Sequence, residues 1–287
     1  MSSDPQPLPK VLSIAGSDSG GGAGIQADLK AFAACGVHGM TAITAITSQN
    51  TVAVTGVWPV PRESIIGQVR AVAEDIGVDA IKIGMLGDAE TIAAVGEALD
   101  LVGSVPIVLD PVMVAESGAR LLDPQAHAAL VEQILPRATI ATPNIPEAEA
   151  LAGAEVGDHD PLDLARAVHR LGPRAVVVTG GHREEATDVF FDGESITELP
   201  GDRVPGGAAH GSGCTHSSAL AAFLAHGLQP VEAARRAKEV ASFAVAHGLS
   251  EVGAGAGPVD VLDVASRRAS VLARRDPPSQ GASRRLT

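Results

Sequence analysis

Aromatic side chains are scarce in this chain of 287 residues, which has five Phe, one Trp and no Tyr. Proteins that bind single-stranded nucleic acid stack its bases on aromatic rings, so the composition excludes a platform of that kind. Lysine occurs only at positions 10, 30, 82 and 238, and the formal net charge is −13. An acidic chain is repelled by nucleic-acid backbones and by anionic membranes. We therefore expect neither nucleic acid nor a membrane among its partners.

Cysteines and long apolar runs are also few. Cys35 and Cys214 lie far apart and form no CxxC motif, which argues against a structural disulfide or zinc site. No apolar run approaches the length of a membrane-spanning helix, and the polar N-terminus lacks the apolar centre of a signal peptide. We expect a cytoplasmic protein with a flexible N-terminus (1–10), one domain (11–271) and a disordered tail (272–287).

Short apolar runs alternate with helical patterns rich in alanine and leucine. Each run is apolar almost without interruption, as strands covered on both faces are. This alternation predicts an α/β fold with a mostly parallel sheet and helices on both sides. Two short runs around Asp192-Gly193 differ and indicate a hairpin. The other expected strands lie at 11–17, 40–48, 79–85, 106–112, 138–144 and 175–181.

The expected helices have readable ends. Asp123-Pro124 and Asp160-Pro161 each place an N-cap residue before a proline at the first helical position. Another helix, over residues 25–36, stops at Gly36.

Ligands of such a sheet bind beyond the carboxyl ends of its strands. Small or polar residues stand at the carboxyl ends of the expected strands. In chain order they are the glycine loop from Gly16 to Gly24, Gln49-Asn50, Gly84-Met85, Asp110-Pro111, Asn144 and Gly180-Gly181.

The early glycine loop, GSDSGGGAGIQADLK at 16–30, matches no common phosphate-binding motif well. A Walker A loop needs a Gly-Lys pair, and none of the lysines follows a glycine. The dinucleotide fingerprint GxGxxG begins at Gly22, but Ala27 stands at the third glycine position, so that match is weak.

A later glycine-rich turn, HGSGCT at 210–215, opens directly into an apolar helix. The backbone amides of residues 211–214 would point outward at the positive end of the helix dipole and could hold an anion without a lysine. A glycine turn that packs two elements closely would have the same sequence. A thiol in the first turn of a helix has a lowered pKa, which we expect for Cys214, whereas Cys35 fits a small buried hydrophobe.

Asn144 and Glu147 are three residues apart just after an expected strand. The carboxylate could hold Mg²⁺ through water. The same pair also fits a capping box, with Asn144 as the N-cap residue and Glu147 at the third helical position. The two interpretations are compatible.

Eight motifs occur in an order that resembles one known family. They are GGAGIQADLKAF, TAITSQNT, KIGMLG, LDPVMVAESG, TPNIPEAEAL, GGH, DVFFDG and HGSGCT, and the resemblance covers about residues 11–258. This set resembles the ribokinase-like superfamily and, within it, the hydroxymethylpyrimidine and phosphomethylpyrimidine kinases of thiamine biosynthesis.

The resemblance implies a ribokinase-like three-layer αβα sandwich, a homodimer, and ATP and Mg²⁺ as cofactors. It implies a pyrimidine site lined by Gly16, Asp18, Ala23, Gln49, Met85, Val112 and Cys214. It places Mg-ATP at Asn144, Glu147, Thr179 and Ser212, with Glu147 and Asp110 on the metal, in part through water. It assigns catalysis to the amides of Gly211 and Gly213 and to Cys214, which would accept the hydroxymethyl proton.

The chain departs from the family pattern at several positions. Thr179 stands where many members have lysine, and Ala209 stands where threonine is usual. Lys82 could supply the missing cation, or its side chain could extend to the surface. His210 is expected to orient the late loop.

The implied activity is ATP-dependent phosphorylation of 4-amino-5-hydroxymethyl-2-methylpyrimidine to its monophosphate and then to the diphosphate. Pyridoxal kinase is the nearest rival activity, although Gln49 suits the donor and acceptor edge of an aminopyrimidine. An ATP-dependent lyase is a more distant rival, since on this fold it keeps Asp at the position of Cys214. A non-catalytic pyrimidine-binding regulator would belong to a different functional class.

Overall fold

A computed structural model describes residues 7–273 except 156, 158, 181–185 and 205–207. The described residues form a sheet of eight strands in the order β10-β9-β8-β7-β6-β5-β1-β2. Every pair from β8 to β2 is parallel, whereas β9 and β10 join the sheet as an antiparallel hairpin. The bounds are β1 Lys10–Ala15, β2 His38–Ile43, β5 Ala80–Ile83, β6 Ile107–Leu109, β7 Ile140–Ala141, β8 Ala175–Val178, β9 Asp188–Phe191 and β10 Ile196–Leu199.

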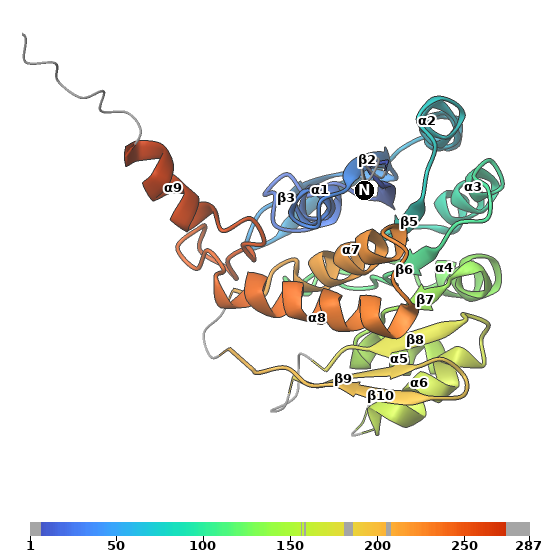
Figure 1. Cartoon of the computed structure of the whole chain (residues 1–287). Coiled ribbons are helices and arrows are strands. Elements are labelled where there is room, and N and C mark those ends of the chain that lie inside the picture. The colour runs from blue at the N-terminus through green and yellow to red at the C-terminus, as the bar shows by residue number, and fades with distance from the viewer. Residues whose placement is uncertain (1–6, 156, 158, 181–185, 205–207, 274–287) are drawn as a thin grey trace, which may run out of the picture.

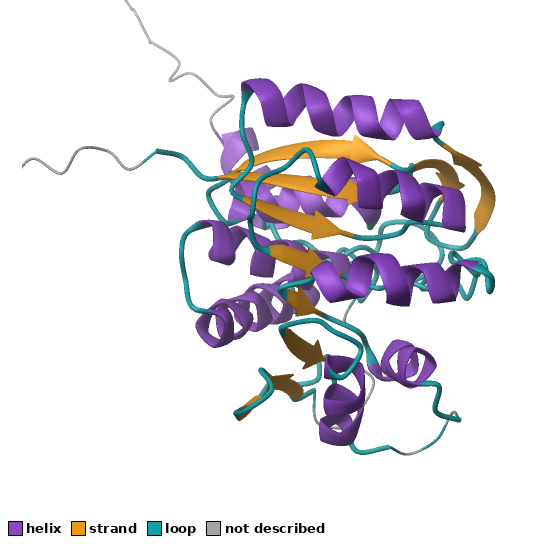
Figure 2. Ribbon diagram, turned by 90° about the vertical axis from the view of Figure 1, so that its right-hand side faces the viewer, coloured by secondary structure: helices purple, strands orange, loops and turns teal. Residues whose placement is uncertain are grey.

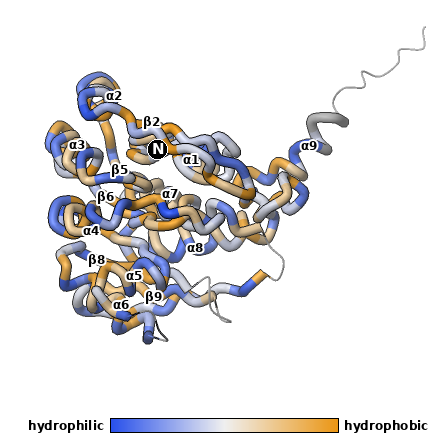
Figure 3. The backbone as a smooth tube through the Cα atoms, turned by 180° about the vertical axis from the view of Figure 1, so that it is seen from behind, coloured by the Kyte–Doolittle hydropathy of each residue, from blue (hydrophilic) through white to orange (hydrophobic). Residues whose placement is uncertain are grey.

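Helices cover both faces of this sheet (Figures 1 and 2), so the predicted three-layer αβα architecture is confirmed. One face carries α1 (Gly24–Ala34), α7 (Ser212–Ala225) and α8 (Pro230–Ala246), which share one buried apolar cluster. The other face carries α2 (Arg62–Asp75), α3 (Ala89–Leu99), α4 (Ala126–Ala129), η1 (Leu130–Ile134), η2 (Leu135–Arg137), α5 (Ile145–Ala152) and α6 (Pro161–His169). Hydrophilic and hydrophobic stretches alternate along α2 and α3 (Figure 3), as expected for helices with one buried face.

The expected strand at 40–48 is wrong as a single element. The chain bends at Thr44, and β3 (Ala45–Gln49) leaves the main sheet to pair antiparallel with β4 (Val54–Pro59). Thr44 is fully buried and its hydroxyl donates to the carbonyl of Met85 at 2.8 Å. Its own amide donates to Ala15 at 3.0 Å, so the bend is held from two neighbouring strands.

The predicted helix ends and the hairpin hold, with one shift. Asp160 caps α6, its Oδ1 accepting from the amide of Leu162, and β9 and β10 flank Asp192-Gly193. Asp123 accepts from the amide of Gln125 at 2.9 Å, but the regular helix α4 begins three residues after it.

Regular secondary structure extends slightly beyond both ends of the predicted domain. Lys10 already belongs to β1, and its amide donates to the Asp79 carboxylate at 2.8 Å. At the other end, α9 (Val264–Ala273) runs past residue 271. The rest of the expected flexible N-terminus and tail, at 1–6 and 274–287, lies outside the described residues. No helix in the described part of the chain is long and apolar enough to cross a membrane.

Candidate active site

A cavity of about 790 Å³ lies at the carboxyl edge of the parallel strands, as the fold rule predicts. Residues that follow β1, β5, β6, β7 and β8 line it together with the start of α7 and part of α8. The predicted site residues on its wall are Gly16, Ala23, Gln49, Met85, Asp110, Val112, Asn144, Glu147, Thr179, Gly211, Ser212, Gly213 and Cys214.

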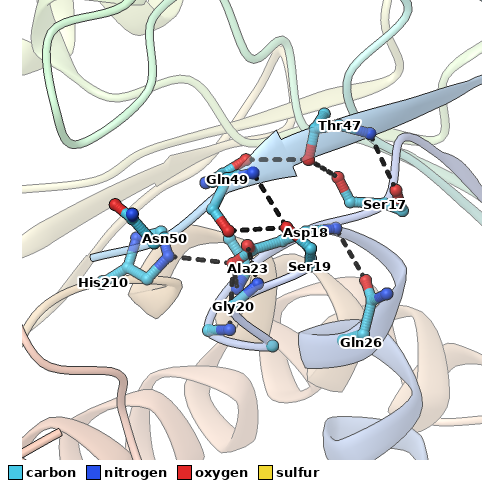
Figure 4. A network of polar contacts seen from close by, with 12 residues as sticks. Ser17, Asp18, Ser19, Gly20, Ala23, Gln26, Thr47, Gln49, Asn50 and His210 are labelled. Carbon is cyan, nitrogen blue, oxygen red and sulfur yellow. Dashed lines mark hydrogen bonds and ion pairs between the residues drawn. The ribbon is translucent and has the colours of Figure 1, made fainter. Parts of the chain in front are cut away.

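Asp18 is not among the residues that line the cavity. It lies in a network of polar contacts with residues of the early loop and with His210 (Figure 4). Its carboxylate accepts hydrogen bonds from the amides of Gly20, Gly22 and Ala23 at 2.8–2.9 Å. Nε2 of His210 lies 3.0 Å from the same carboxylate. Burial alone would raise the pKa of Asp18, but the bonds from His210 and the amides outweigh it and lower the pKa. Asp18 is therefore an anionic clamp for the early loop, and its contact with His210 links it to the late loop.

The two glycine-rich loops touch each other at their glycines. A Cβ atom on Gly22 would lie 2.2 Å from Cδ2 of His210, and one on Gly211 would lie 1.8 Å from the carbonyl oxygen of Gly22. Gly211 also has a φ of 84°, which favours glycine. Close packing of the two loops therefore explains Gly22 and Gly211. A Cβ atom on Gly213 would meet nothing within 4 Å, so that glycine borders open space.

The backbone at the start of α7 offers fewer free donors than the sequence suggested. The amide of Ser212 donates to the carbonyl of Ala209 at 3.0 Å, so it does not face the cavity as a free donor. In the described part of the chain, the amides of Gly211, Gly213 and Cys214 have no hydrogen-bond acceptor. All three residues line the cavity. The anion cradle at this helix terminus therefore rests on these three amides.

The predicted lowering of the Cys214 pKa is wrong. Burial, helped by the nearby carboxylates of Asp110 and Asp28, raises the pKa of this thiol to about 12, although Lys82 opposes them. The helix dipole is too weak to compensate for these effects, so Cys214 is a neutral thiol at neutral pH. Burial also raises the pKa of Cys35, to about 11, and Cys35 packs against the core as a small hydrophobe.

Lys82 does not extend to the surface, because its side chain is fully buried on the wall of the cavity. Its Nζ donates to Oδ1 of Asp28 at 2.9 Å and lies 3.9 Å from Oδ2 of Asp110. Asp28 also accepts from the hydroxyls of Ser13 and Ser218. Burial would lower the pKa of Lys82, but Asp28, Cys214 and Asp110 outweigh it and raise the pKa. The cavity wall therefore carries a permanent, fixed cation.

Asn144 and Glu147 form the predicted capping box at the start of α5. Oδ1 of Asn144 accepts from the Glu147 amide at 2.9 Å, and Oε2 of Glu147 accepts from the Asn144 amide at 3.0 Å. Burial, followed by repulsion from Asp110, raises the pKa of Glu147 to about 8. Burial also raises the pKa of Asp110, against the opposing effects of Lys82 and a hydrogen bond from Ser217. Two buried carboxyl groups thus disfavour each other's charge.

Gln49 ends β3 in the small sheet and not the second strand of the main sheet. Its backbone is tied to the early loop, because its amide donates to the Ser19 hydroxyl at 2.8 Å and that hydroxyl donates to the Gln49 carbonyl at 2.6 Å. Its side chain lines the cavity, with Oε1 3.4 Å from the Thr47 hydroxyl. Gln49 therefore lies on the cavity wall, as predicted, and is not an ordinary surface glutamine.

Several polar residues on the cavity wall were missed from the sequence. Among them are Asp188 at the start of β9, His216 on α7 and Lys238 on α8. Nζ of Lys238 lies 2.7 Å from Oδ1 of Asp188. The DVFFDG motif that opens with Asp188 and the rarity of lysine were the sequence signals, but neither indicates that these residues meet.

Comparisons with known proteins identify the family. The sequence model of the phosphomethylpyrimidine kinase family matches residues 18–260. A hydroxymethylpyrimidine/phosphomethylpyrimidine kinase of Rhizobium meliloti is 50% identical over 255 residues, which cover 87% of this chain and 95% of that protein.

Solved structures give the same result. Bacillus subtilis pyridoxal kinase in complex with ADP superposes with a TM-score of 0.83 and 37% identity, covering 90% of this chain and 99% of that one. The phosphomethylpyrimidine kinase of Clostridium difficile has a TM-score of 0.71 and 41% identity, covering 80% and 96%. With a family match over most of its length and a close relative over nearly its whole length, the chain belongs to the phosphomethylpyrimidine kinase family, whose members are phosphotransferases.

Proposed function

We propose that this protein transfers the terminal phosphoryl group of ATP to 4-amino-5-hydroxymethyl-2-methylpyrimidine, and a second one to the resulting monophosphate. The observation that carries this proposal is the set of free amides, Gly211, Gly213 and Cys214, on the wall of the cavity that Gln49 also lines. An anion cradle and a planar donor-acceptor side chain on one cavity suit a phosphate donor and an aminopyrimidine. The name of the Rhizobium meliloti relative supports the same substrates.

Positioning and charge neutralisation carry most of this reaction, because phosphoryl transfer has a loose transition state. The amides of Gly213 and Cys214 hold the equatorial oxygens of the transferred group, as preorganised donors do for developing charge. Lys82 adds a fixed positive charge beside Cys214. Gly16, Ala23, Met85 and Val112 surround the pyrimidine with small or apolar surface.

Cys214 acts as a neutral thiol. With a pKa of about 12 it is already protonated at neutral pH and cannot take a proton, and a loose transition state does not require a strong base. The thiol orients the hydroxymethyl group, whose proton passes late in the transfer to an oxygen of the phosphoryl group. In the second phosphorylation the attacking atom is a phosphate oxygen, which is already an anion and needs no base.

Asp110 and Glu147 fit a magnesium ion brought with ATP. Both are buried carboxyl groups with raised pKa values, and a divalent cation would favour their ionised forms. No group of three or more His, Cys, Asp or Glu side chains among the described residues could hold a metal ion alone, which suits a cation bound mainly through water and phosphate oxygens. When bound, Mg²⁺ would neutralise charge on the phosphate chain. Asn144, bridged to Thr179 of the neighbouring segment, keeps Glu147 in place.

Pyridoxal kinase is the second candidate. It is supported by the similarity to Bacillus subtilis pyridoxal kinase, which is crystallised with ADP. Pyridoxal also presents a hydroxymethyl group on a nitrogen heterocycle. A lyase on the same fold and a non-catalytic regulator are less consistent with Cys214 and the free amides.

We also propose that the protein is a homodimer joined through the small β3–β4 sheet. Ile46, Val57 and Trp58 of this sheet are about half exposed, at 46%, 41% and 56%. Apolar surface of this kind is typical of interfaces between proteins. A cytoplasmic location stays a prediction.

Mass spectrometry of the products tests the proposed reaction. After incubation with the hydroxymethylpyrimidine, ATP and Mg²⁺, we expect pyrimidine carrying one and then two phosphoryl groups. Pyridoxal in a parallel incubation tests the second candidate. ATP consumption without phosphorylated pyrimidine, or pyrimidine binding without turnover, would contradict the proposal.

Replacing Cys214 by Ala separates the two phosphorylations. We expect the rate of the alcohol step to fall on the order of 10²-fold, the size of loss that a misplaced reacting group causes, and the monophosphate step to fall clearly less. The rates are measured separately, starting from the alcohol and from the monophosphate. Equal losses in both steps would rule out a role for the thiol in orienting the alcohol.

Replacing Glu147 by Gln should remove a pH dependence of stability. The pKa of Glu147 is raised from 4.5 to about 8 in the folded protein, so the folded state binds this proton more tightly than the unfolded state. The resulting stabilisation is full below pH 4.5 and is lost as the pH rises towards 8. Gln can keep the capping box but does not titrate.

The measurement is the free energy of urea-induced unfolding as a function of pH, without nucleotide. As the pH rises through this range, that free energy should fall more steeply for the original protein than for Glu147→Gln. Parallel curves for the two proteins would show that Glu147 is ionised throughout.

Sedimentation equilibrium tests the dimer. We expect twice the 29.0 kDa mass of one chain, and one chain mass for Trp58→Glu, because a charge at the centre of an apolar interface is costly to bury. Ile196→Glu is the matched control, since Ile196 is 44% exposed on β10, the strand at the other end of the sheet order. A single-chain mass for the original protein would overturn the proposal.

A further inference from the structure

His216 is a buried histidine without a hydrogen-bond partner. It lies on α7, lines the cavity and is 4% exposed. Neither of its ring nitrogens has a partner among the described residues. A neutral imidazole carries one N–H donor, and leaving such a donor unpaired inside a protein destabilises the structure. A buried group of this kind calls for a partner that the described residues do not supply.

Asp188 is the nearest candidate partner. It is 1% exposed, and its Oδ1 accepts from the Gly180 amide at 2.9 Å and from Nζ of Lys238 at 2.7 Å. Its Oδ2 lies 3.8 Å from Nε2 of His216. One carboxylate oxygen thus has two donors, whereas the other faces the imidazole just beyond hydrogen-bond distance.

Lys238 is the cation that Asp188 holds on the cavity wall. Its side chain is 13% exposed and lines the cavity. An anionic phosphate chain that enters the cavity attracts the ammonium group of Lys238 partly away from Asp188. Leaving the buried Asp188 carboxylate without its partner is strongly unfavourable, which opposes this movement. A second hydrogen-bond donor to Asp188 would lower that cost.

We propose that His216 is a positioning residue for the nucleotide, acting through Asp188 on Lys238. A shift of roughly 1 Å or less brings Nε2–H of His216 to hydrogen-bond distance from Oδ2 of Asp188. The carboxylate is then held by His216 and the Gly180 amide, and Lys238 is free to reach the phosphate chain. This inference rests on the proposed function only in taking ATP as the phosphoryl donor.

A direct contact between His216 and the nucleotide is less consistent with the geometry. Both ring nitrogens are themselves buried. Burial lowers the pKa of His216 more than Asp188 raises it, so the ring is neutral. A neutral ring is better suited to donating a hydrogen bond to a carboxylate than to binding a phosphate as a cation.

Two nearly isosteric substitutions test the donor at Nε2. The side-chain amide of Gln reaches the position of Nε2, whereas that of Asn reaches the position of Nδ1. We expect His216→Asn to weaken ADP binding and to raise the KM for ATP roughly tenfold, about the effect of one lost charge-assisted hydrogen bond, with a smaller change in kcat. His216→Gln should retain most of the affinity. ADP binding is measured by calorimetry on the full chain.

A double-mutant cycle tests the route through Lys238. Lys238→Met should weaken ADP binding by itself, and adding His216→Asn should weaken it little further, because the effect of His216 passes through Lys238. Independent, additive losses would overturn the proposal. Unchanged ADP affinity in both His216 variants, with only the melting temperature altered, would overturn it as well.

The outcome is distinguishable from failure of the proposed function. If the original protein binds ADP but phosphorylates no pyrimidine, the substrate assignment fails while the ADP measurements still decide the role of His216. If the original protein binds no ADP, the inference itself is overturned.

Discussion

The carboxylate of Asp18 joins two loops that lie 192 residues apart in the sequence. It accepts hydrogen bonds from the early loop and pairs with His210 of the late loop, and its lowered pKa keeps it charged. Because the loops then pack glycine against backbone, the start of α7 is fixed beside the cavity. The free amides of Gly213 and Cys214 owe their position to this clamp. Preorganised donors of this kind need no rearrangement when charge develops on a phosphoryl group.

A second constraint is the charge buried beneath the cavity. Lys82 is held by Asp28 and lies near Asp110, and this arrangement joins α1 to strands at the centre of the sheet. Buried ion pairs add little stability compared with apolar packing, so their presence indicates a functional use. Here a fixed cation stands beside two carboxyl groups with raised pKa values, in a cavity suited to a phosphate chain and its counterion.

The sequence was sufficient for the architecture and for most of the cavity wall. Continuous apolar runs identify strands buried on both faces, and the edge rule brings the residues that follow them together. It did not reveal β4, because most of that strand is exposed and has no continuous apolar run. The prediction of a lowered pKa for Cys214 was wrong. The helix dipole that would lower this pKa is visible in the local sequence, whereas the burial and the charge of Asp28 that raise it come from the tertiary fold. Asp18 was predicted to line the pyrimidine site, because nothing in the sequence shows that its carboxylate accepts hydrogen bonds from three backbone amides.

His216 and Lys238 illustrate the same limit. They lie on consecutive helices and meet at Asp188 only because α7 and α8 pack on one face of the sheet. The most direct test of the account is a crystal structure with a non-hydrolysable ATP analogue and the hydroxymethylpyrimidine. The account predicts that an oxygen of the terminal phosphate accepts hydrogen bonds of about 3 Å from the amides of Gly213 and Cys214. A terminal phosphate bound elsewhere, with both amides turned away from it, would contradict the account.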